Sequence, residues 1–446
     1  MSTALVWFRD DLRVHDHEGL HRAMARFDRV IACYVLDSNA TDTDNWGFPI
    51  VGKHRMAFLL ESLADLSSNL EEIQVPLLLF EGSPEIVLRE LLADENVDTV
   101  FVQKSLIGPD LSVEQQILEE LGSDAKFEFY YGQFLFHPAD LPFSLTDFPE
   151  SFSLFRQEVE RKCLPRDLID TVPPARFSVD STGDFASPGL EDREQRGIDP
   201  RSAFPFRGGE TFGNYRVNDY LWDSKRLTRY RETKDGLVGP EYSTKFSPWL
   251  ANGCLSPRHI YAELKRFEKK VVQNNSTYWL FLMLLWRDYY KYLALIKPEI
   301  FFDISGFAQR DYQHTSDPDA VANWIRGSTD NDFVNAVMIE LRTTGWMSSR
   351  GRLVVSSYFC RELQQDWRIG ASWFASQMID LDPALNWGNW MTVAGVGDDP
   401  DSHVWLDADA QSKRYDPDGS FRATWLTKPT LAEGSGSKDS FASDGQ

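Results

Sequence analysis

Cysteine is scarce in this sequence of 446 residues, and its four copies stand far apart (Cys33, Cys163, Cys254 and Cys360). No two of them form a CxxC pair, so the pattern indicates neither a disulfide framework nor a zinc site nor an iron–sulfur cluster, and we expect no bound metal. Unpaired cysteines are typical of a reducing compartment, and the first eight residues resemble a strand rather than a targeting segment. Together these features predict a cytoplasmic protein.

Long hydrophobic runs are lacking as well. The most apolar stretch, residues 278–296, contains the charged residues Arg287, Asp288 and Lys291. Charged side chains inside a bilayer are costly, so this stretch is typical of a buried helix in a soluble protein. We therefore expect no membrane partner.

Basic residues are outnumbered, with 46 Lys and Arg against 68 Asp and Glu and a formal charge of −22. This balance normally counts against a nucleic-acid partner, because phosphate binding depends on Lys and Arg. The charge is uneven, however, since residues 206–300 contain 16 basic and 10 acidic residues, a local +6. An acidic coat around a preserved binding face, as in salt-adapted proteins, is one interpretation, and ordinary surface acidity is the other.

Short apolar runs alternate with helical patterns in the first part of the chain. The predicted strands are 4–8, 30–36, 76–80, 99–103 and 127–131, and the predicted helices between them are 54–73, 84–93 and 112–121. This βαβ rhythm predicts an α/β domain with a doubly wound parallel sheet over residues 1–132. The first strand is followed by Arg9-Asp10-Asp11 without the glycines of a dinucleotide fingerprint, which argues against an ordinary NAD-binding domain.

The rest of the chain lacks this alternation. Residues 133–206 are rich in proline and polar residues and are predicted to connect two domains. Residues 207–427 are predicted to form an all-α domain, and residues 428–446 a disordered tail. The helices expected in the second domain are 215–232, 256–272, 276–296, 318–326, 331–344, 349–365 and 370–380.

Two segments of the predicted helical domain have residues suited to nucleotide binding. Hydroxyls at Ser243, Thr244 and Ser247 precede a helix that begins with proline, which suits a phosphate cradle. Helix capping is the alternative and, taken alone, the more common role of such hydroxyls. Further on, Trp286 and Tyr290 share one helix face, which suits stacking on a nucleobase, although a core position explains the same spacing.

Two later segments complete this series. Residues 344–352 contain Arg350 and Arg352, and residues 380–390 contain Asp380, Asp382 and several amides. Buried carboxylates need partners, and an ion pair between Arg352 and Asp380 would supply one. Each segment alone could be structural, but four in succession favour a binding site.

At this point the sequence resembles the photolyase and cryptochrome family, and within it the DASH cryptochromes. The resemblance extends to about residue 426 and is carried by LVWFRDDLRVHD (5–16), RGGET (207–211), KFSPWL (245–250), STYW (276–279), WRD (286–288), MSSRGR (347–352), NWGNW (386–390), VAGVG (393–397) and YDPDG (415–419). The run NWGNW followed by VAGVG is specific to the DASH branch.

The resemblance implies FAD, held inside the helical domain, with the protein tuning the photochemistry of the cofactor. Arg352 and Asp380 match the family's ion pair beside the flavin ring, and Asn386 matches the residue that faces flavin N5. The other residues that the resemblance assigns to FAD binding are Tyr230, Ser243, Thr244, Lys245, Phe246, Ser247, Leu381 and Asp382.

The resemblance also implies a row of tryptophans that passes electrons. Trp390 and Trp367, which are 23 residues apart, match its first two members. The third is missing, because His314 occupies the expected position, with Tyr312 two residues earlier. We expect slower or rerouted electron transfer, with Tyr312 as one route.

Two departures from the family pattern bear on function. Met283 stands where photolyases have a carboxylate that hydrogen-bonds the damaged pyrimidine, and a thioether is at best a weak acceptor. Ser105 stands where folate-binding relatives have a glutamate, which weakens the expectation of an antenna folate, methenyltetrahydrofolate. Both departures are visible in the sequence.

Three functions follow from these features. The first is a light-driven lyase that repairs cyclobutane pyrimidine dimers, with single-stranded DNA preferred because flipping a base costs less there. Trp286, Arg287 and Arg350 would line its DNA pocket. The second is a blue-light photoreceptor, which Met283 favours and whose signalling partner the sequence does not identify. The third, a flavoprotein without photochemistry, is disfavoured by Asn386 and the two tryptophans.

Overall fold

The computed structural model describes residues 2–169, 197–398 and 405–427. Its amino-terminal part contains a five-stranded parallel sheet in the order β3-β2-β1-β4-β5. The strands are β1 (Thr3–Phe8), β2 (Arg29–Asp37), β3 (Leu77–Gly82), β4 (Thr99–Gln103) and β5 (Lys126–Tyr130). The order reverses on the two sides of β1, which is the doubly wound topology that the sequence predicts.

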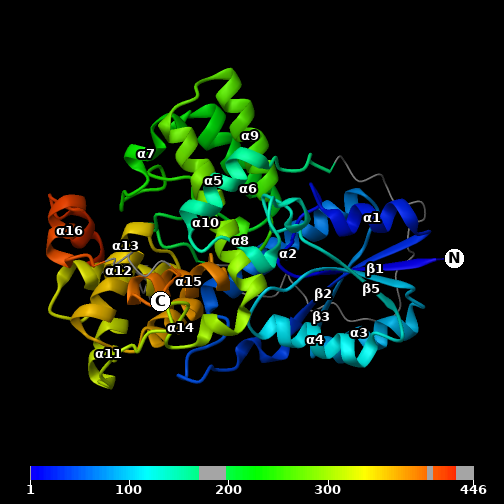
Figure 1. The fold of residues 1–446 in the computed structure, drawn as a ribbon, viewed down its shortest axis with the longest axis horizontal. Coiled ribbons are helices and arrows are strands. Elements are labelled where there is room, and N and C mark those ends of the chain that lie inside the picture. Colours follow the sequence, from blue (N-terminus) through cyan, green and yellow to red (C-terminus); the bar gives the residue numbers. More distant parts are fainter. Residues whose placement is uncertain (1, 170–196, 399–404, 428–446) are drawn as a thin grey trace, which may run out of the picture.

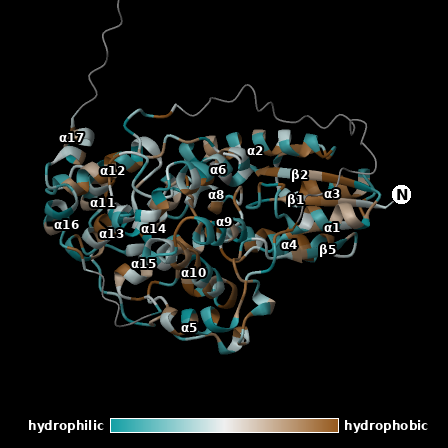
Figure 2. Ribbon diagram, turned by 90° about the horizontal axis from the view of Figure 1, so that it is seen from above, coloured by the Kyte–Doolittle hydropathy of each residue, from teal (hydrophilic) through white to brown (hydrophobic). Residues whose placement is uncertain are grey.

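Helices cover both faces of this sheet because its strands are apolar on both faces. Ala4 and Val6 of β1 belong to one buried cluster, and Leu5 and Trp7 belong to another on the opposite face. The helices of this part are α1 (Glu18–Arg26), α2 (Lys53–Glu72), α3 (Pro84–Asp94), α4 (Pro109–Leu121) and α5 (Phe152–Lys162). Figure 1 shows α1 on one side of the sheet and α3 and α4 on the other. Figure 2 shows the strands coloured mainly as hydrophobic.

The later part is helical, and no strand follows Tyr130 within the described residues. Its helices are α6 (Glu210–Asn218), α7 (Tyr230–Thr233), α8 (Ser247–Ala251), α9 (Pro257–Lys270), α10 (Asn275–Ile296), α11 (Pro318–Arg326), α12 (Asp332–Thr344), α13 (Ser349–Ser357), α14 (Trp367–Gln377), α15 (Pro383–Ala394), α16 (Ala408–Tyr415) and α17 (Ser420–Leu426). The fold class is therefore the predicted one, an α/β sheet domain followed by an all-α region. The domain boundaries after residues 132 and 206 stay predictions, and the predicted tail lies outside the described residues.

Several helices differ from the predicted ranges. The helix expected over 215–232 is interrupted, because Lys225 adopts a left-handed backbone with φ +52° between α6 and α7. The helix expected over 349–365 ends as α13 and continues as a π-helical turn, Tyr358–Glu362. Helices α1, α5, α8, α15, α16 and α17 lie outside the predicted ranges. No helix among the described residues is long and apolar enough to span a membrane.

The two parts are joined by side chains that bond to backbone across the boundary. Asp288 of α10 accepts hydrogen bonds from the backbone N–H groups of Leu135 and Phe136, at 3.0 and 2.9 Å. Glu210 accepts in the same way from Val14 and His15, at 2.7 and 3.0 Å. Burial raises the pKa of Asp288 and of Glu210 to about 7. The motif residues around position 288 therefore fix the sheet against the helices.

Candidate functional site

An ion pair forms the centre of the candidate site. Arg352 of α13 donates from Nη2 to Asp380 Oδ1 and Oδ2 at 2.9 and 2.7 Å, and Ser247 Oγ at the start of α8 donates to Asp380 Oδ2 at 2.7 Å. The Asp380 side chain is only 1% exposed, whereas 26% of the Arg352 side chain is exposed. Charge-assisted bonds of this kind fix a guanidinium in one orientation. The predicted pairing of Arg352 with Asp380 is thus present in the structure.

The loop before α8 is held in place by a residue that was not predicted from the sequence. Buried Arg216 of α6 donates to the carbonyl oxygens of Ser243 and Thr244, each at 3.0 Å. Ser247, at the end of this loop, is exposed although its hydroxyl bonds to a buried carboxylate. Open space therefore begins at Ser247. Arg216 carries no motif of its own, and only the folded loop reveals its role.

Lys245 lies in the predicted phosphate-binding run but turns away from it. Its backbone is left-handed, with φ +62°, and its Nζ lies 3.0 Å from the ring centre of Tyr242 and 4.8 Å from that of Trp346. Burial holds the pKa of Lys245 well below its usual value, and burial raises the pKa of nearby Glu340 to about 8. The structure thus directs this side chain into the core, which differs from the expectation of a phosphate ligand.

The remaining predicted FAD residues occupy three places. Phe246 is buried within the same loop, and Tyr230 is buried at the start of α7, beside α10. Leu381 is half-buried in the segment between α14 and α15. Asp382 caps α15 and forms an ion pair with Lys291 Nζ at 2.7 Å, facing the sheet domain rather than the Arg352 pair.

Asn386 of α15 has a defined orientation. Its Nδ2 donates to the carbonyl oxygen of Ala371 at 2.9 Å. An amide that donates with its nitrogen presents its oxygen as the free acceptor. No hydrogen bond to the Asn386 oxygen is found among the described residues, so this oxygen can accept a bond from an N–H group of a ligand.

The two predicted electron-transfer tryptophans lie on adjacent helices. Trp390 of α15 packs against Gly370 of α14, where an added Cβ would lie 2.3 Å from the indole ring. Trp367 begins α14, is fully buried, and donates from Nε1 to the carbonyl of Ile304 at 3.1 Å. Trp367 also contacts a third indole, Trp387, with ring centres 5.8 Å apart. His314 is exposed, as a residue at the third position should be, but is not an indole.

The three predicted DNA residues have different surroundings. Trp286 is half-buried and stacks on Phe152 of α5, with ring centres 3.5 Å apart and an angle of 11°. Arg350 is half-buried and bonds to Asp235 at 3.2 Å. Arg287, in contrast, is buried and donates to the carbonyl oxygens of Gln133 and Leu250. Both acceptors are backbone groups inside the protein, so Arg287 is not placed to contact a strand from solvent.

A small polar cavity lies between the sheet and the helical part. It measures about 60 Å³ and sits at the carboxyl ends of β1 and β4, the switch point of the sheet. Ser105 and Asp10 line it from one side, and Lys291 and Asp382 from the other. Burial raises the pKa of Asp10 to about 7. Ligand pockets usually measure about 300–1,000 Å³, so this one holds a few water molecules rather than a pterin.

The donor set near Arg352 fits a flavin nucleotide better than a metal. The site offers a fixed guanidinium, a hydroxyl, an amide oxygen and an indole, Trp390, whose buried Nε1 has no hydrogen-bond partner in the described part of the chain. Flavin rings present both donors and acceptors along one edge, which such groups can match. No group of three or more His, Cys, Asp or Glu side chains that could hold a metal is found among the described residues.

Comparisons with known proteins follow this geometry. Two family models match: the DNA photolyase model over residues 4–175, and the FAD binding domain of DNA photolyase over residues 279–437. A cryptochrome DASH from Synechocystis sp. is 40% identical over 435 residues, covering 95% of this chain and 87% of that protein. The chloroplastic/mitochondrial cryptochrome DASH of Arabidopsis thaliana is 39% identical, covering 95% and 75%.

Solved structures of a cryptochrome and a photolyase are also similar to this chain. A Synechocystis cryptochrome superposes with a TM-score of 0.89 at 38% identity, covering 96% of this chain and 89% of that one. A class III photolyase from Agrobacterium tumefaciens superposes with a TM-score of 0.81 at 25% identity, covering 96% and 86%. The similarity therefore extends over both parts of the fold.

Proposed function

This chain belongs to the photolyase and cryptochrome family as a DASH-type cryptochrome with an FAD-binding domain, and we propose that it repairs cyclobutane pyrimidine dimers in single-stranded DNA with blue light. The observation that carries the proposal is the cluster of Arg352, Asp380 and Ser247, which opens to space within an otherwise buried helical region. Bound there, FAD would supply light absorption and electron exchange.

Each group around that space has a separate role in the proposal. Asp380 keeps Arg352 oriented, so that the guanidinium can face the flavin ring. Asn386 offers its amide oxygen to a protonated ring nitrogen, because its amide nitrogen is already bonded to Ala371. The loop at Ser243 and Thr244 would hold the phosphates mainly through hydroxyls and backbone, since Lys245 points into the core.

Trp390 and Trp367 would carry electrons inward from the surface. Their buried positions on α15 and α14 suit a relay, because indoles are easily oxidised and the surrounding core is insulating. In the absence of a third indole at position 314, two groups can follow Trp367. Trp387 contacts it directly, and Tyr312 bonds to the carbonyl of Gln365 at 3.0 Å, two residues before it.

The DNA contact would form at Trp286. Phe152 supports one face of its ring at 3.5 Å, so the indole is a rigid platform on which a base can stack. Arg350, which is half-buried and paired with Asp235, would add a cationic contact, whereas buried Arg287 would not reach the strand. Single-stranded DNA is the proposed substrate, because a dimer flips out of an unpaired strand at lower cost.

Met283 supports a second candidate function, a blue-light photoreceptor without repair activity. It lies one turn before Trp286 on α10, where a carboxylate would hydrogen-bond the damaged base. A thioether accepts hydrogen bonds only weakly, so the dimer would be held less firmly. We rank this function second because the stacking platform at Trp286 is intact.

An antenna folate is not part of the proposal. The cavity beside Ser105 has a volume of about 60 Å³, too small for a pterin unless the two parts separate. A cytoplasmic location is kept as a proposal and is supported by four free, buried cysteines.

Repair of a defined substrate tests the proposal. Purified protein with bound FAD would be photoreduced and illuminated with a single-stranded oligonucleotide that contains one thymine dimer. We expect restored thymines in the light and none in the dark. A protein that binds this DNA and keeps its FAD but restores no thymines would instead be a photoreceptor.

A further inference from the structure

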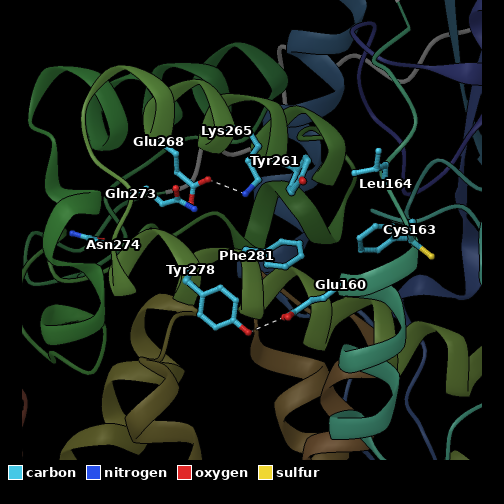
Figure 3. Close-up of a pocket in the computed structure, with 11 residues that line it drawn as sticks. Glu160, Cys163, Leu164, Tyr261, Lys265, Glu268, Gln273, Asn274, Tyr278 and Phe281 are labelled. Atoms are coloured by element: carbon cyan, nitrogen blue, oxygen red, sulfur yellow. Dashed lines mark hydrogen bonds and ion pairs between the residues drawn. The ribbon is translucent and has the colours of Figure 1, made fainter.

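A second, larger cavity is lined by none of the predicted site residues. It measures about 300 Å³ and is enclosed by the end of α5, the middle of α9 and the start of α10. Figure 3 shows Phe281 and Tyr261 near its centre, Tyr278 below them, and Glu268 with Gln273 toward one side. We call it the α5–α9 cavity. Its volume is at the lower end of the range for small-molecule sites, enough for one nucleoside.

Aromatic rings form one part of the wall of the α5–α9 cavity, beside polar and charged side chains. The ring centre of Phe281 lies 5.6 Å from that of Tyr261 and 6.3 Å from that of Tyr278. Tyr278 is 38% exposed and the neighbouring Leu164 is 82% exposed. Apolar and aromatic side chains that stay exposed around a hollow are typical of a binding site.

The cavity lies beside a basic helix in an acidic protein. Helix α9 contains five Lys and Arg residues against two Glu residues, whereas the whole chain has a charge of −22. Lys269 and Lys270 end this helix, are exposed, and form no ion pair with any described residue. Lys269 and Lys270 thus supply unpaired cations on the helix that carries Tyr261, and cations together with aromatic rings are the groups that bind the backbone and bases of a single strand.

The two carboxylates in the cavity wall already have hydrogen-bond partners. Glu268 accepts a bond from Lys265 Nζ at 2.8 Å. Glu160 accepts one from the Tyr278 hydroxyl at 2.7 Å, and Arg156 lies 4.0 Å from the same carboxylate. Glu268 is therefore paired with a cation and Glu160 is hydrogen-bonded, while the amide of Gln273 stays exposed at the rim.

Helix α5 connects this cavity to Trp286. Phe152, at its first turn, stacks on Trp286, and Glu160, eight residues later, lines the cavity. Eight residues of α-helix span about 12 Å. Stacked bases rise about 3.4 Å each, so this distance corresponds to roughly two to four nucleotides of a strand.

From these contacts we propose that the α5–α9 cavity is a second nucleotide site for single-stranded DNA. It takes a base of the strand two to four nucleotides from the one at Trp286, stacked among Tyr261, Tyr278 and Phe281, with backbone phosphates on Lys269 and Lys270. This inference rests on the proposed function, because it requires that the strand binds at Trp286.

Binding of fluorescein-labelled oligothymidine tests the proposal with two variants. Tyr278→Ala removes one wall, and the double change Lys269→Glu and Lys270→Glu reverses the two free charges. The controls are Tyr278→Phe, which keeps the ring, Tyr215→Ala, which removes a tyrosine 67% exposed elsewhere, and reversal of exposed Lys53 with exposed Lys297. FAD absorbance and the thermal midpoint check that each variant is folded.

We expect Tyr278→Ala to weaken binding of a 12-mer at least about fivefold, the effect of losing roughly 1 kcal/mol of stacking, with little change for a 2-mer, which is too short to reach from Trp286 to the cavity. The double reversal should also lower the salt slope of 12-mer binding by about 1.4. If the 12-mer binds the wild type and both variants bind it equally well, the proposed second site is wrong, while the proposed function stands. No binding of either oligonucleotide to the wild type would overturn the proposed function as well.

Cross-linking locates the base directly. A 5-iodouracil placed two to four nucleotides from a thymine dimer should cross-link to Tyr261, Tyr278 or Phe281 under long-wavelength ultraviolet light, and peptide mass spectrometry identifies the residue. Cross-links confined to other surfaces would contradict the placement. If these rings bind a small cation such as trimethylammonium, and DNA does not compete with this cation, the proposed nucleotide site would also be contradicted.

Discussion

At the scale of single residues, the two cations of the site, Arg352 and Lys245, differ in orientation. Arg352 is held by Asp380 and stays partly exposed, whereas Lys245 turns inward above Tyr242. The orientation of Arg352 was predictable from the sequence because buried opposite charges pair. The orientation of Lys245 was not, because its left-handed backbone accompanies packing against Tyr242 and Trp346, which no local pattern reveals.

Met283 limits repair in this account. Changing Met283→Glu should raise the rate of dimer repair at least about tenfold, because a hydrogen bond to a charged group contributes roughly 1.5–3 kcal/mol. The rate is measured on the single-stranded oligonucleotide under constant illumination. Met283→Leu is the matched control and should leave the rate near that of the wild type. Equal rates for the Glu and Leu variants would show that position 283 does not contact the dimer.

Glu340 predicts a pH dependence of stability. Burial raises its pKa from 4.5 to about 8 in the folded protein. The folded state thus keeps a proton that the unfolded state has lost, so this contribution to stability is present below about pH 4.5 and declines as the pH rises to about 8. Glu340→Gln cannot lose that proton, and it should gain about 1 kcal/mol or more relative to the wild type between pH 5 and 8.5.

Urea denaturation at the two pH values measures this difference. Glu119→Gln, at an exposed position of α4, is the control and should follow the wild type at both. Parallel curves for Glu340→Gln and the wild type would mean that Glu340 is ionised throughout.

At the scale of elements, regular patterns were predictable and interruptions were not. The five strands appear where the apolar runs lie, because a parallel sheet covered on both faces needs continuous apolar residues. Helix α1 escaped prediction because it contains only a few apolar positions, such as Leu20 and Met24, among charged residues. The break at Lys225 could not be foreseen either, since no glycine or proline marks it.

Contacts between elements were equally hidden. Arg287 was predicted to bind DNA because it follows Trp286, but its acceptors, the carbonyls of Gln133 and Leu250, come from remote segments. The stacking of Phe152 on Trp286 also joins residues far apart in sequence. Such partners from remote segments determine which face of a helix is buried.

The link between α10 and the sheet domain gives a prediction at this scale. Asp288→Ala removes the acceptor of the Leu135 and Phe136 N–H groups, which stay buried. Each unsatisfied group costs about 1–3 kcal/mol, so the free energy of unfolding should fall by about 2–6 kcal/mol. Denaturant titration measures the loss, and Asp288→Asn, which keeps one acceptor oxygen, should lie between the two. A change below about 0.5 kcal/mol would contradict the role of this contact.

At the scale of the whole molecule, the charge of −22 is unevenly distributed, because residues 206–300 have a local charge of +6 and the rest of the chain is strongly acidic. Repulsion among so many carboxylates opposes the compact state, and salt screens it. We expect the thermal midpoint to rise by several degrees between 0.1 and 2 M KCl, with NaCl giving the same curve. A midpoint that falls or stays constant would show that the acidic surface does not strain the fold.

The decisive experiment is an action spectrum of dimer repair. Single-stranded oligonucleotide with one thymine dimer is illuminated at a series of wavelengths, and the restored thymines are counted per photon. We expect repair that follows the flavin absorption band of the protein, with no additional shorter-wavelength antenna maximum. Absence of repair at every wavelength, with FAD and DNA both bound, would contradict it.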